Sequence, residues 1–268
     1  MDLWIAIVLG IVEGLTEYLP VSSTGHLILV GQWLGAVDEG AKSFDIVIQL
    51  GAILAVLVHY RALFAARLLG LLRRDPLAFR LFGALTIAFV PAAITAFLLR
   101  KLIKERLFGA LPVAIALLVG GVLMIVVERW RKGRKIEGQE DGAEQVTFRR
   151  ALLIGLGQCF ALWPGASRSM CTIVAGQLTG LSTRASAEFS FLLAVPTLGA
   201  ATVYEAYKSR HELTSGVGAT QLGVGLVVSF FVAWAVIAAF LKYLQRRGLE
   251  PFGYYRIALG ILVFALSR

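Results

Sequence analysis

Two glutamates near the N-terminus have a spacing that could bind a metal ion. Glu13 and Glu17 are four residues apart in an apolar segment, so a helix places them on one face. Paired carboxylates in an apolar segment are costly, and their oxygens suit a hard divalent cation. We predict that Glu13 and Glu17 hold Mg²⁺ or Ca²⁺. The alternative is that one of them only caps or hydrogen-bonds the nearby reversal of the chain.

A break in the helix follows these glutamates at once. Pro20 ends the first helix, and Ser22 or Ser23 can cap a second one, whose N-terminus attracts anions. Ser23 and His26 lie three residues apart on that helix, as a nucleophile and a base could. We predict Ser23 as the nucleophile, with His26 and an activated water as alternatives, and with His26 or Glu17 taking the proton. The catalytic residues of this segment are thus Glu17, Ser23 and His26, and its phosphate contacts are Ser22 and Thr24.

A second break carries an arginine. Pro164 is followed by Arg168 in a segment that is again apolar. An unpaired arginine is costly inside a membrane, and its guanidinium matches a phosphate with two parallel hydrogen bonds. We therefore predict a catalytic role for Arg168 on a phosphate, the alternative being a structural pair with Glu188. Its neighbours are predicted to contact the same phosphate, namely Gly165, Ala166, Ser167, Ser169 and Thr172.

Other reactive side chains are predicted to be structural. His59 fits a membrane interface and His211 a solvated loop. Asp45 and Glu188 are expected to be buried, with a structural role such as capping the hairpins described below. The two cysteines form no CxxC motif and no metal-binding spacing, so they are expected to be free thiols.

The composition of the whole chain is that of a membrane protein. Of its 268 residues, 58% are apolar and 16% are charged, against roughly 25% charged in a soluble domain, and the mean hydropathy is +0.78. This excludes a disordered chain, a secreted disulfide-rich protein and a typical cytosolic enzyme. The formal charge of +9 comes from basic residues between apolar runs, so we expect contacts with anionic lipid headgroups and no nucleic-acid partner.

Six stretches are long and apolar enough to cross a hydrocarbon layer of roughly 30 Å. They are residues 44–60, 81–99, 111–127, 187–204, 222–241 and 252–266. Two further apolar regions, 1–34 and 151–180, are broken at Pro20 and Pro164 into halves that are too short to span. These two regions are predicted to form re-entrant helical hairpins.

The two halves of the sequence resemble each other. Asp45 matches Glu188 at an offset of 143 residues, and Ser23 aligns with Ser167 at the two breaks. Each repeat holds one hairpin and three crossings, an odd number, so the second repeat must be inverted in the membrane. We predict one all-α polytopic membrane domain with an inverted-topology repeat. It consists of a first repeat (1–128), a basic cytoplasmic linker (129–150) and a second, inverted repeat (151–268).

The charges of the loops predict the orientation. Residues 61–80, 129–150 and 242–250 together hold 15 lysines and arginines, and the loops on the opposite side hold 8. The positive-inside rule places the richer side in the cytoplasm. Both termini are then outside, and the first hairpin enters from the outside.

Both breaks resemble the signatures of a known family. The run from Glu13 to His26, and the run from Pro164 to Ser169 with Thr172, resemble the two motifs of the BacA-type undecaprenyl-diphosphate phosphatases. The resemblance covers the whole chain. It implies hydrolysis of undecaprenyl diphosphate to undecaprenyl phosphate and inorganic phosphate, which recycles the lipid carrier of cell-wall synthesis and confers bacitracin resistance. It also implies a divalent cation, a bacterial inner (plasma) membrane with the active site toward the periplasm, and functional residues at Glu13, Glu17, Ser23, His26 and Arg168.

Two other functions fit parts of this pattern. Inverted repeats with broken helices are also transporter architecture, so a polyprenyl-phosphate flippase or secondary transporter could use the same phosphate site. The run Ser22–His26 faintly resembles the short motif of phosphatidate-type phosphatases, but the second histidine of that family is missing. The expected partners are a polyprenyl diphosphate and membrane lipids, and the chain could also form a homodimer.

Overall fold

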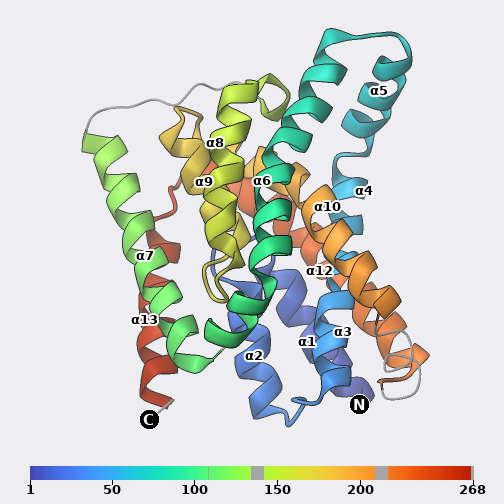
Figure 1. Ribbon diagram of the computed structural model, residues 1–268, viewed down its shortest axis with the longest axis vertical. Helices are drawn as coiled ribbons and strands as arrows, with labels where there is room; N and C mark the ends of the chain where they lie inside the picture. Colours follow the sequence, from blue (N-terminus) through green and yellow to red (C-terminus); the bar gives the residue numbers. More distant parts are fainter. Residues whose placement is uncertain (108, 134–141, 209–216, 267–268) are drawn as a thin grey trace. The chain divides into compact units, whose positions relative to one another are not determined.

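The protein is helical wherever the structure describes it. The computed structural model describes residues 1–107, 109–133, 142–208 and 217–266, and within these ranges it contains helices and connecting turns but no β-strand (Figure 1). The predicted all-α class is therefore confirmed. The predicted linker, 129–150, is described at both of its ends. Helix α7 (Ala110–Gly133) ends within it, and the short 3₁₀ helix η1 (Ala143–Gln145) precedes helix α8 (Phe148–Cys159). Residues 134–141 of the linker and His211 lie outside the described residues.

Five helical stretches in the described residues are long and apolar enough to cross a membrane. The first combines two consecutive helices, α3 (Glu39–Val47) and α4 (Gln49–His59). The others are Pro76–Leu99 within α6 (Pro76–Arg106), α7 (Ala110–Gly133), α10 (Thr183–Lys208) and α12 (Ala219–Leu244). These coincide with five of the six predicted crossings.

The sixth predicted crossing corresponds to α13 (Glu250–Leu266), a helix of 17 residues. At 1.5 Å per residue it is about 25 Å long, which is shorter than a hydrocarbon layer of roughly 30 Å. Length alone therefore does not make α13 a membrane span, and the sixth crossing stays a prediction.

Four short helices flank the two predicted breaks. Helix α1 (Leu3–Thr16) packs on α2 (Ser23–Trp33), and α8 (Phe148–Cys159) packs on α9 (Arg168–Leu178). The short 3₁₀ helix η2 (Phe160–Leu162) follows α8 directly. Each of the four helices has 11 to 14 residues, too few to cross a membrane. The breaks thus lie where the two prolines predict them.

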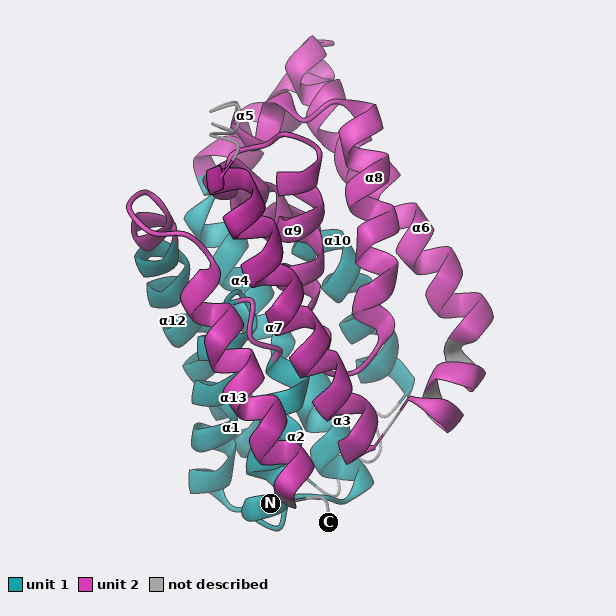
Figure 2. Cartoon of the chain, turned by 90° about the vertical axis from the view of Figure 1, so that its left-hand side faces the viewer, with its two compact units in different colours: residues 1–19, 23–61, 194–240 teal, residues 20–22, 62–193, 241–268 magenta. Residues whose placement is uncertain are grey.

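The chain divides into two compact units, each assembled from separate stretches (Figure 2). Unit 1 holds residues 1–19, 23–61 and 194–240, and unit 2 holds residues 20–22, 62–193 and 241–268. Each unit thus takes segments from both predicted repeats. Contacts within a unit do not test a similarity between repeats, so the repeats stay predictions.

Small residues let the helices of unit 1 approach closely. A Cβ atom added to Gly14 on α1 would lie 2.7 Å from the Cβ of Val232 on α12. A Cβ atom on Gly225 of α12 would lie 2.5 Å from the ring of Phe44 on α3. Such contacts are typical of membrane helices, because lipid tails are as apolar as the side chains and close packing must supply the attraction.

Unit 2 is packed in the same way. Helix α7 lies beside α13 (Figure 1), and a Cβ atom on Gly121 of α7 would lie 2.7 Å from the carbonyl oxygen of Gly253 on α13. Helix α8 packs on α6, where a Cβ atom on Gly155 would lie 2.5 Å from the carbonyl oxygen of Ala88. Glycine is therefore needed at these helix crossings for space.

We predict that Gly155→Ala lowers the stability of the protein. The new methyl group must push α8 away from the backbone of α6, at a cost of about 1–3 kcal/mol. The measurement is the thermal unfolding midpoint of the purified protein in detergent. Gly199→Ala is the control, because Gly199 also lies within a helix but has no atom within 4 Å of its added Cβ. An unchanged or raised midpoint for Gly155→Ala would contradict the described packing.

Candidate active site

The two glutamates of the first motif are buried at the C-terminal end of α1. Glu13 is 0% exposed and Glu17 is 5% exposed. The backbone N–H of Glu17 donates to the carbonyl oxygen of Glu13 at 3.0 Å, so the helical turn joining them is formed. They therefore share one face of the helix, as their spacing predicts.

Ser23 is hydrogen-bonded to one of these glutamates across the break. Its Oγ donates to Oε2 of Glu17 at 2.6 Å, and both residues belong to unit 1. A hydroxyl–carboxylate distance of about 2.5–2.7 Å is typical of a short, charge-assisted hydrogen bond. The carboxylate is thus placed to take the proton of Ser23 when its oxygen attacks an electrophile.

The other residues predicted on α2 differ in their exposure. His26 lies one turn after Ser23 and is half-buried, whereas Thr24 is exposed. Ser22 is buried, with 2% of its surface exposed. The first motif thus provides a buried carboxylate–hydroxyl pair with a histidine one turn further along the helix.

A serine with left-handed backbone immediately precedes the second helix at each break. Ser22 has a φ of 75° and Ser167 a φ of 70°. Such angles cost a residue other than glycine about 1–3 kcal/mol and tend to occur at functional sites. Ser22 and Ser167 thus correspond in backbone conformation, whereas the alignment of the two halves of the sequence matches Ser23 with Ser167.

The hydroxyl of Ser167 caps α9. Its Oγ accepts a hydrogen bond from the backbone N–H of Met170 at 3.3 Å and lies 3.0 Å from the Oγ of Ser169. Gly165 has a φ of 92°, and a Cβ atom there would lie 2.8 Å from the carbonyl oxygen of Val113. The predicted phosphate-contact residues Gly165, Ala166, Ser167, Ser169 and Thr172 are all buried. They belong to a tight turn that leads into a helix N-terminus.

Arg168 is held at the start of α9 by a residue that the sequence analysis did not select. Its Nη1 donates to the carbonyl oxygen of Ser190 at 2.8 Å and contacts the Oγ of Ser190 at 3.4 Å. That Oγ also lies 2.7 Å from the hydroxyl of Thr172. The only sequence signal for Ser190 was a serine within an otherwise apolar predicted crossing.

The alternative partner for Arg168 has a cation of its own. Oε1 of Glu188 accepts from Nε of Arg184 at 2.9 Å, one turn earlier on α10. Glu188 is half-buried rather than fully buried. The ion pair that the structure gives Glu188 thus lies within its own helix.

Arg256 of α13 is the largest residue that is fully buried, and the sequence analysis missed it. Its guanidinium donates to three carbonyl oxygens of unit 2: Nη1 to Pro20 at 3.3 Å, and Nη2 to Ala116 and Gly165 at 3.0 Å each. Pro20 belongs to the first break and Gly165 to the second. One buried cation therefore holds a segment of each break. The signal was present, because Arg256 lies in an apolar run just as Arg168 does.

An apolar cavity of about 400 Å³ lies beside the second break in unit 2. Its walls come from α7, from α8 and η2, and from α9. They include Gly120, Phe160, Trp163, Ala166 and Met170. A hydrocarbon chain fits such walls, and Ala166 places the cavity directly at the turn before Arg168.

The paired glutamates fit a divalent cation only together with other ligands. In the part of the chain that the structure describes, no group of three or more His, Cys, Asp and Glu side chains forms a metal site. Glu13 and Glu17 offer buried carboxylate oxygens on one helical face. Magnesium is often held by one or two carboxylates, with substrate phosphates and water as the remaining ligands. The donor set therefore fits a cation that a phosphate substrate helps to bind.

Comparison with known proteins decides the family. A family model described as "Bacitracin resistance protein BacA" matches residues 6–262. The chain belongs to the BacA family. Three relatives of the chain are each named "Undecaprenyl-diphosphatase". The relative from Sorangium cellulosum is 60% identical over 97% of this chain and 85% of its own length. The relatives from Novosphingobium aromaticivorans and Thermoanaerobacter pseudethanolicus are each 47% identical, over 95% and 97% of this chain and 94% and 95% of their own lengths.

Family membership confirms the resemblance that the two motifs carry. The match extends well beyond the motifs and includes α13, where Arg256 lies. Together with the five apolar helices, it makes the chain a multi-pass membrane protein.

Arg256 generates a prediction for stability. Arg256→Lys keeps the charge but replaces a planar fork with a single ammonium, which cannot reproduce bonds from both Nη1 and Nη2. We expect a loss of about 1–3 kcal/mol in the free energy of unfolding, because buried carbonyls lose their donors. Unfolding of the purified protein in detergent measures this.

Arg129→Lys is the matched control, because the Arg129 side chain is 62% exposed and its ion pair with Glu250 lies at the surface, where such pairs contribute little. We expect it to unfold like the native chain. If Arg256→Lys also unfolded like the native chain, the three buried hydrogen bonds would not hold the breaks.

Proposed function

We propose that this BacA-family chain hydrolyses undecaprenyl diphosphate to undecaprenyl phosphate and inorganic phosphate. This activity recycles the lipid carrier of cell-wall synthesis and confers resistance to bacitracin. The hydrogen bond from Ser23 to Glu17 is the observation that carries the chemistry, since it supplies a nucleophile with its base already in contact. The name shared by the relatives supports the substrate.

Ser23 is the nucleophile in this proposal. Its Oγ attacks the terminal phosphorus of the diphosphate while Glu17 takes the hydroxyl proton. The bond from that phosphorus to the bridging oxygen breaks, and undecaprenyl phosphate leaves. A water molecule then cleaves the phosphoserine, which releases inorganic phosphate and regenerates Ser23. His26, which lies one turn further along α2, serves the second step as a base.

Arg168 and its turn neutralise the charge of the diphosphate. Nη1 of Arg168 donates to the carbonyl oxygen of Ser190, and the hydroxyl of Ser190 contacts that of Thr172. These contacts define the position of the guanidinium charge. The backbone N–H groups at the start of α9 point out of the N-terminal end of the helix, which is where a helix binds an anion. Arg168 also stabilises the charge that develops on the phosphoryl oxygens during transfer. Within unit 2, Arg256 donates to carbonyl oxygens of Pro20 and Gly165.

Glu13 and Glu17 would hold the divalent cation, Mg²⁺ or Ca²⁺. When bound, the cation supplies positive charge to the phosphate oxygens. Both carboxylates are buried, so a cation there would relieve the cost of burying them.

The apolar cavity beside Ala166 receives part of the polyprenyl chain in this proposal. Its walls offer no charge to the lipid, and its place at the second break keeps the tail next to the residues that bind the phosphates.

The surrounding fold is proposed to be an inverted repeat with six crossings and two re-entrant hairpins, 1–34 and 151–180. The packing of α1 on α2 and of α8 on α9 supports the hairpins. The left-handed serines Ser22 and Ser167 support a relation between the two. The repeats are 1–128 and 151–268, joined by the cytoplasmic linker 129–150. The loop charges support a location in the bacterial inner membrane with the active site toward the periplasm.

The proposal predicts release of inorganic phosphate from undecaprenyl diphosphate by the purified protein in detergent. Release should require Mg²⁺ or Ca²⁺ and stop with EDTA. Arg168→Lys should lower turnover about 100-fold or more, because an ammonium lacks the planar fork and a lost charge-stabilising donor has an effect of this size. Arg184→Lys is the matched control, since Arg184 pairs with Glu188 on the surface of α10.

Near-native turnover of Arg168→Lys would contradict the role of Arg168. Unchanged release in EDTA would contradict the metal site. Absence of phosphate release from well-folded native protein would overturn the proposed function and turn the same residues into a lipid-phosphate transport site.

A further inference from the structure

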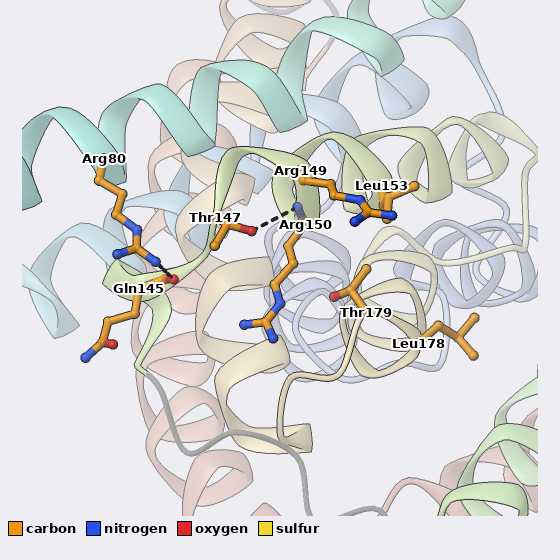
Figure 3. Close-up of a pocket in the computed structure, with 8 residues that line it drawn as sticks. All are labelled: Arg80, Gln145, Thr147, Arg149, Arg150, Leu153, Leu178 and Thr179. Atoms are coloured by element: carbon orange, nitrogen blue, oxygen red, sulfur yellow. Dashed lines mark hydrogen bonds between the residues drawn. The ribbon is translucent and has the colours of Figure 1, made fainter.

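A basic cavity of about 700 Å³ lies at the end of α8 that is remote from the second break (Figure 3). It is lined by Arg80 of α6, by Arg149 and Arg150 of the first turn of α8, and by Thr179 at the end of α9. Helix α8 has 12 residues, which separates its two ends by about 18 Å at 1.5 Å per residue. The cavity is therefore a different place from the turn that precedes Arg168.

The cavity has a strongly positive lining. Arg80, Arg149 and Arg150 contribute three guanidinium groups, and none of the described residues that line the cavity is acidic. Two acids near the lining residues in the described part of the sequence are ion-paired: Glu144 accepts from Nε of Arg67, and Asp75 accepts from Nη1 of the same arginine at 2.8 Å. Neither acid lines the cavity, and both are paired with an arginine that does not line it either, so the lining keeps its positive charge.

The lining is also fixed by hydrogen bonds. A guanidinium N–H of Arg80 donates to the carbonyl oxygen of Gln145, which ties α6 to η1 (Figure 3). The hydroxyl of Thr147 accepts from the backbone N–H of Arg150 at 3.3 Å and caps α8. These hydrogen bonds fix Arg80 of α6 against η1 and hold the first turn of α8.

An apolar groove of about 440 Å³ adjoins the basic cavity and shares Arg80 and Thr147 with it. Its other walls are Pro76, Phe79 and Phe148. Phe79 is 53% exposed and Phe148 is 51% exposed, and Arg80 lies in the second turn of a membrane-spanning stretch that begins at Pro76. The basic cavity matches the headgroup of an anionic lipid, and the apolar groove matches its chain. Both lie at the end of a span, where lipid headgroups are found.

We propose that this cavity binds the phosphate of an anionic membrane lipid, with an acyl or prenyl chain of that lipid in the adjoining groove. The three arginines match the charge and the fork geometry of a phosphate. Phe79 and Phe148 match the chain. A freely diffusing phosphate would use the arginines but have no use for the groove, which is why a lipid is the better match. The site is separate from the proposed hydrolysis and does not depend on it.

Native mass spectrometry of the full chain in detergent tests this proposal, with phosphatidylglycerol, phosphatidylcholine and inorganic phosphate as probes. We expect phosphatidylglycerol to bind more tightly than phosphatidylcholine. The triple variant Arg80→Gln, Arg149→Gln, Arg150→Gln should weaken phosphatidylglycerol binding roughly tenfold or more. The control removes three exposed basic side chains outside the cavity, with Lys242→Gln, Arg246→Gln and Arg247→Gln, and should keep native binding.

Three results would overturn the proposal. The first is equal weakening in the control, which would mean attraction by net charge alone. The second is equal binding of the two lipids. The third is displacement of phosphatidylglycerol by inorganic phosphate alone, which would mark a site for free phosphate. If circular dichroism shows that the triple variant is misfolded, the single variant Arg149→Gln replaces it, with the same expected direction of change.

Discussion

The buried guanidinium of Arg256 is the interaction on which both breaks of this protein depend. A helix that stops inside an apolar protein leaves carbonyl groups without their usual donors, and each unpaired group is costly. Arg256 donates to carbonyls at Pro20, Ala116 and Gly165. One side chain thus donates to one carbonyl of each break and to one of the neighbouring helix α7. The cost of burying its charge is offset only while all three carbonyls accept, which ties the local structure of the breaks together.

The breaks place polar groups where an unbroken helix could not, which is the functional reason to bury a charge at Arg256. At the first break, the reversal after Pro20 brings the hydroxyl of Ser23 back to the carboxylate of Glu17. At the second, the turn through Gly165 and Ser167 starts a helix at Arg168, whose guanidinium is fixed by Ser190. Two left-handed serines mark these points, where local strain is balanced by the contacts on either side.

Local features of the sequence predicted much of this arrangement. The contacts between residues far apart in the sequence could not be predicted from those features. Two glutamates four residues apart must share a helical face, and Pro20 and Pro164 lie at the two breaks. Proline alone does not predict a break, because Pro91 and Pro196 lie inside α6 and α10. Arg168 bonds to Ser190, which is 22 positions away, and Arg256 bonds to Pro20, which is 236 positions away. The spacing of residues within a helix does not predict contacts over such separations. Ser22 and Ser167 share a positive φ just before the second helix of each break, and letter identity alone did not indicate this backbone conformation.

The central claim is that Ser23 and Glu17 act as one chemical unit. A double-mutant cycle on phosphate release tests it most directly, with Ser23→Ala, Glu17→Gln and the double variant assayed in parallel. If the two residues act as a unit, each single change should lower turnover by about a thousandfold, and the double variant should lose little more than either single one. Losses that multiply in the double variant, or near-native turnover in Ser23→Ala, would contradict the claim.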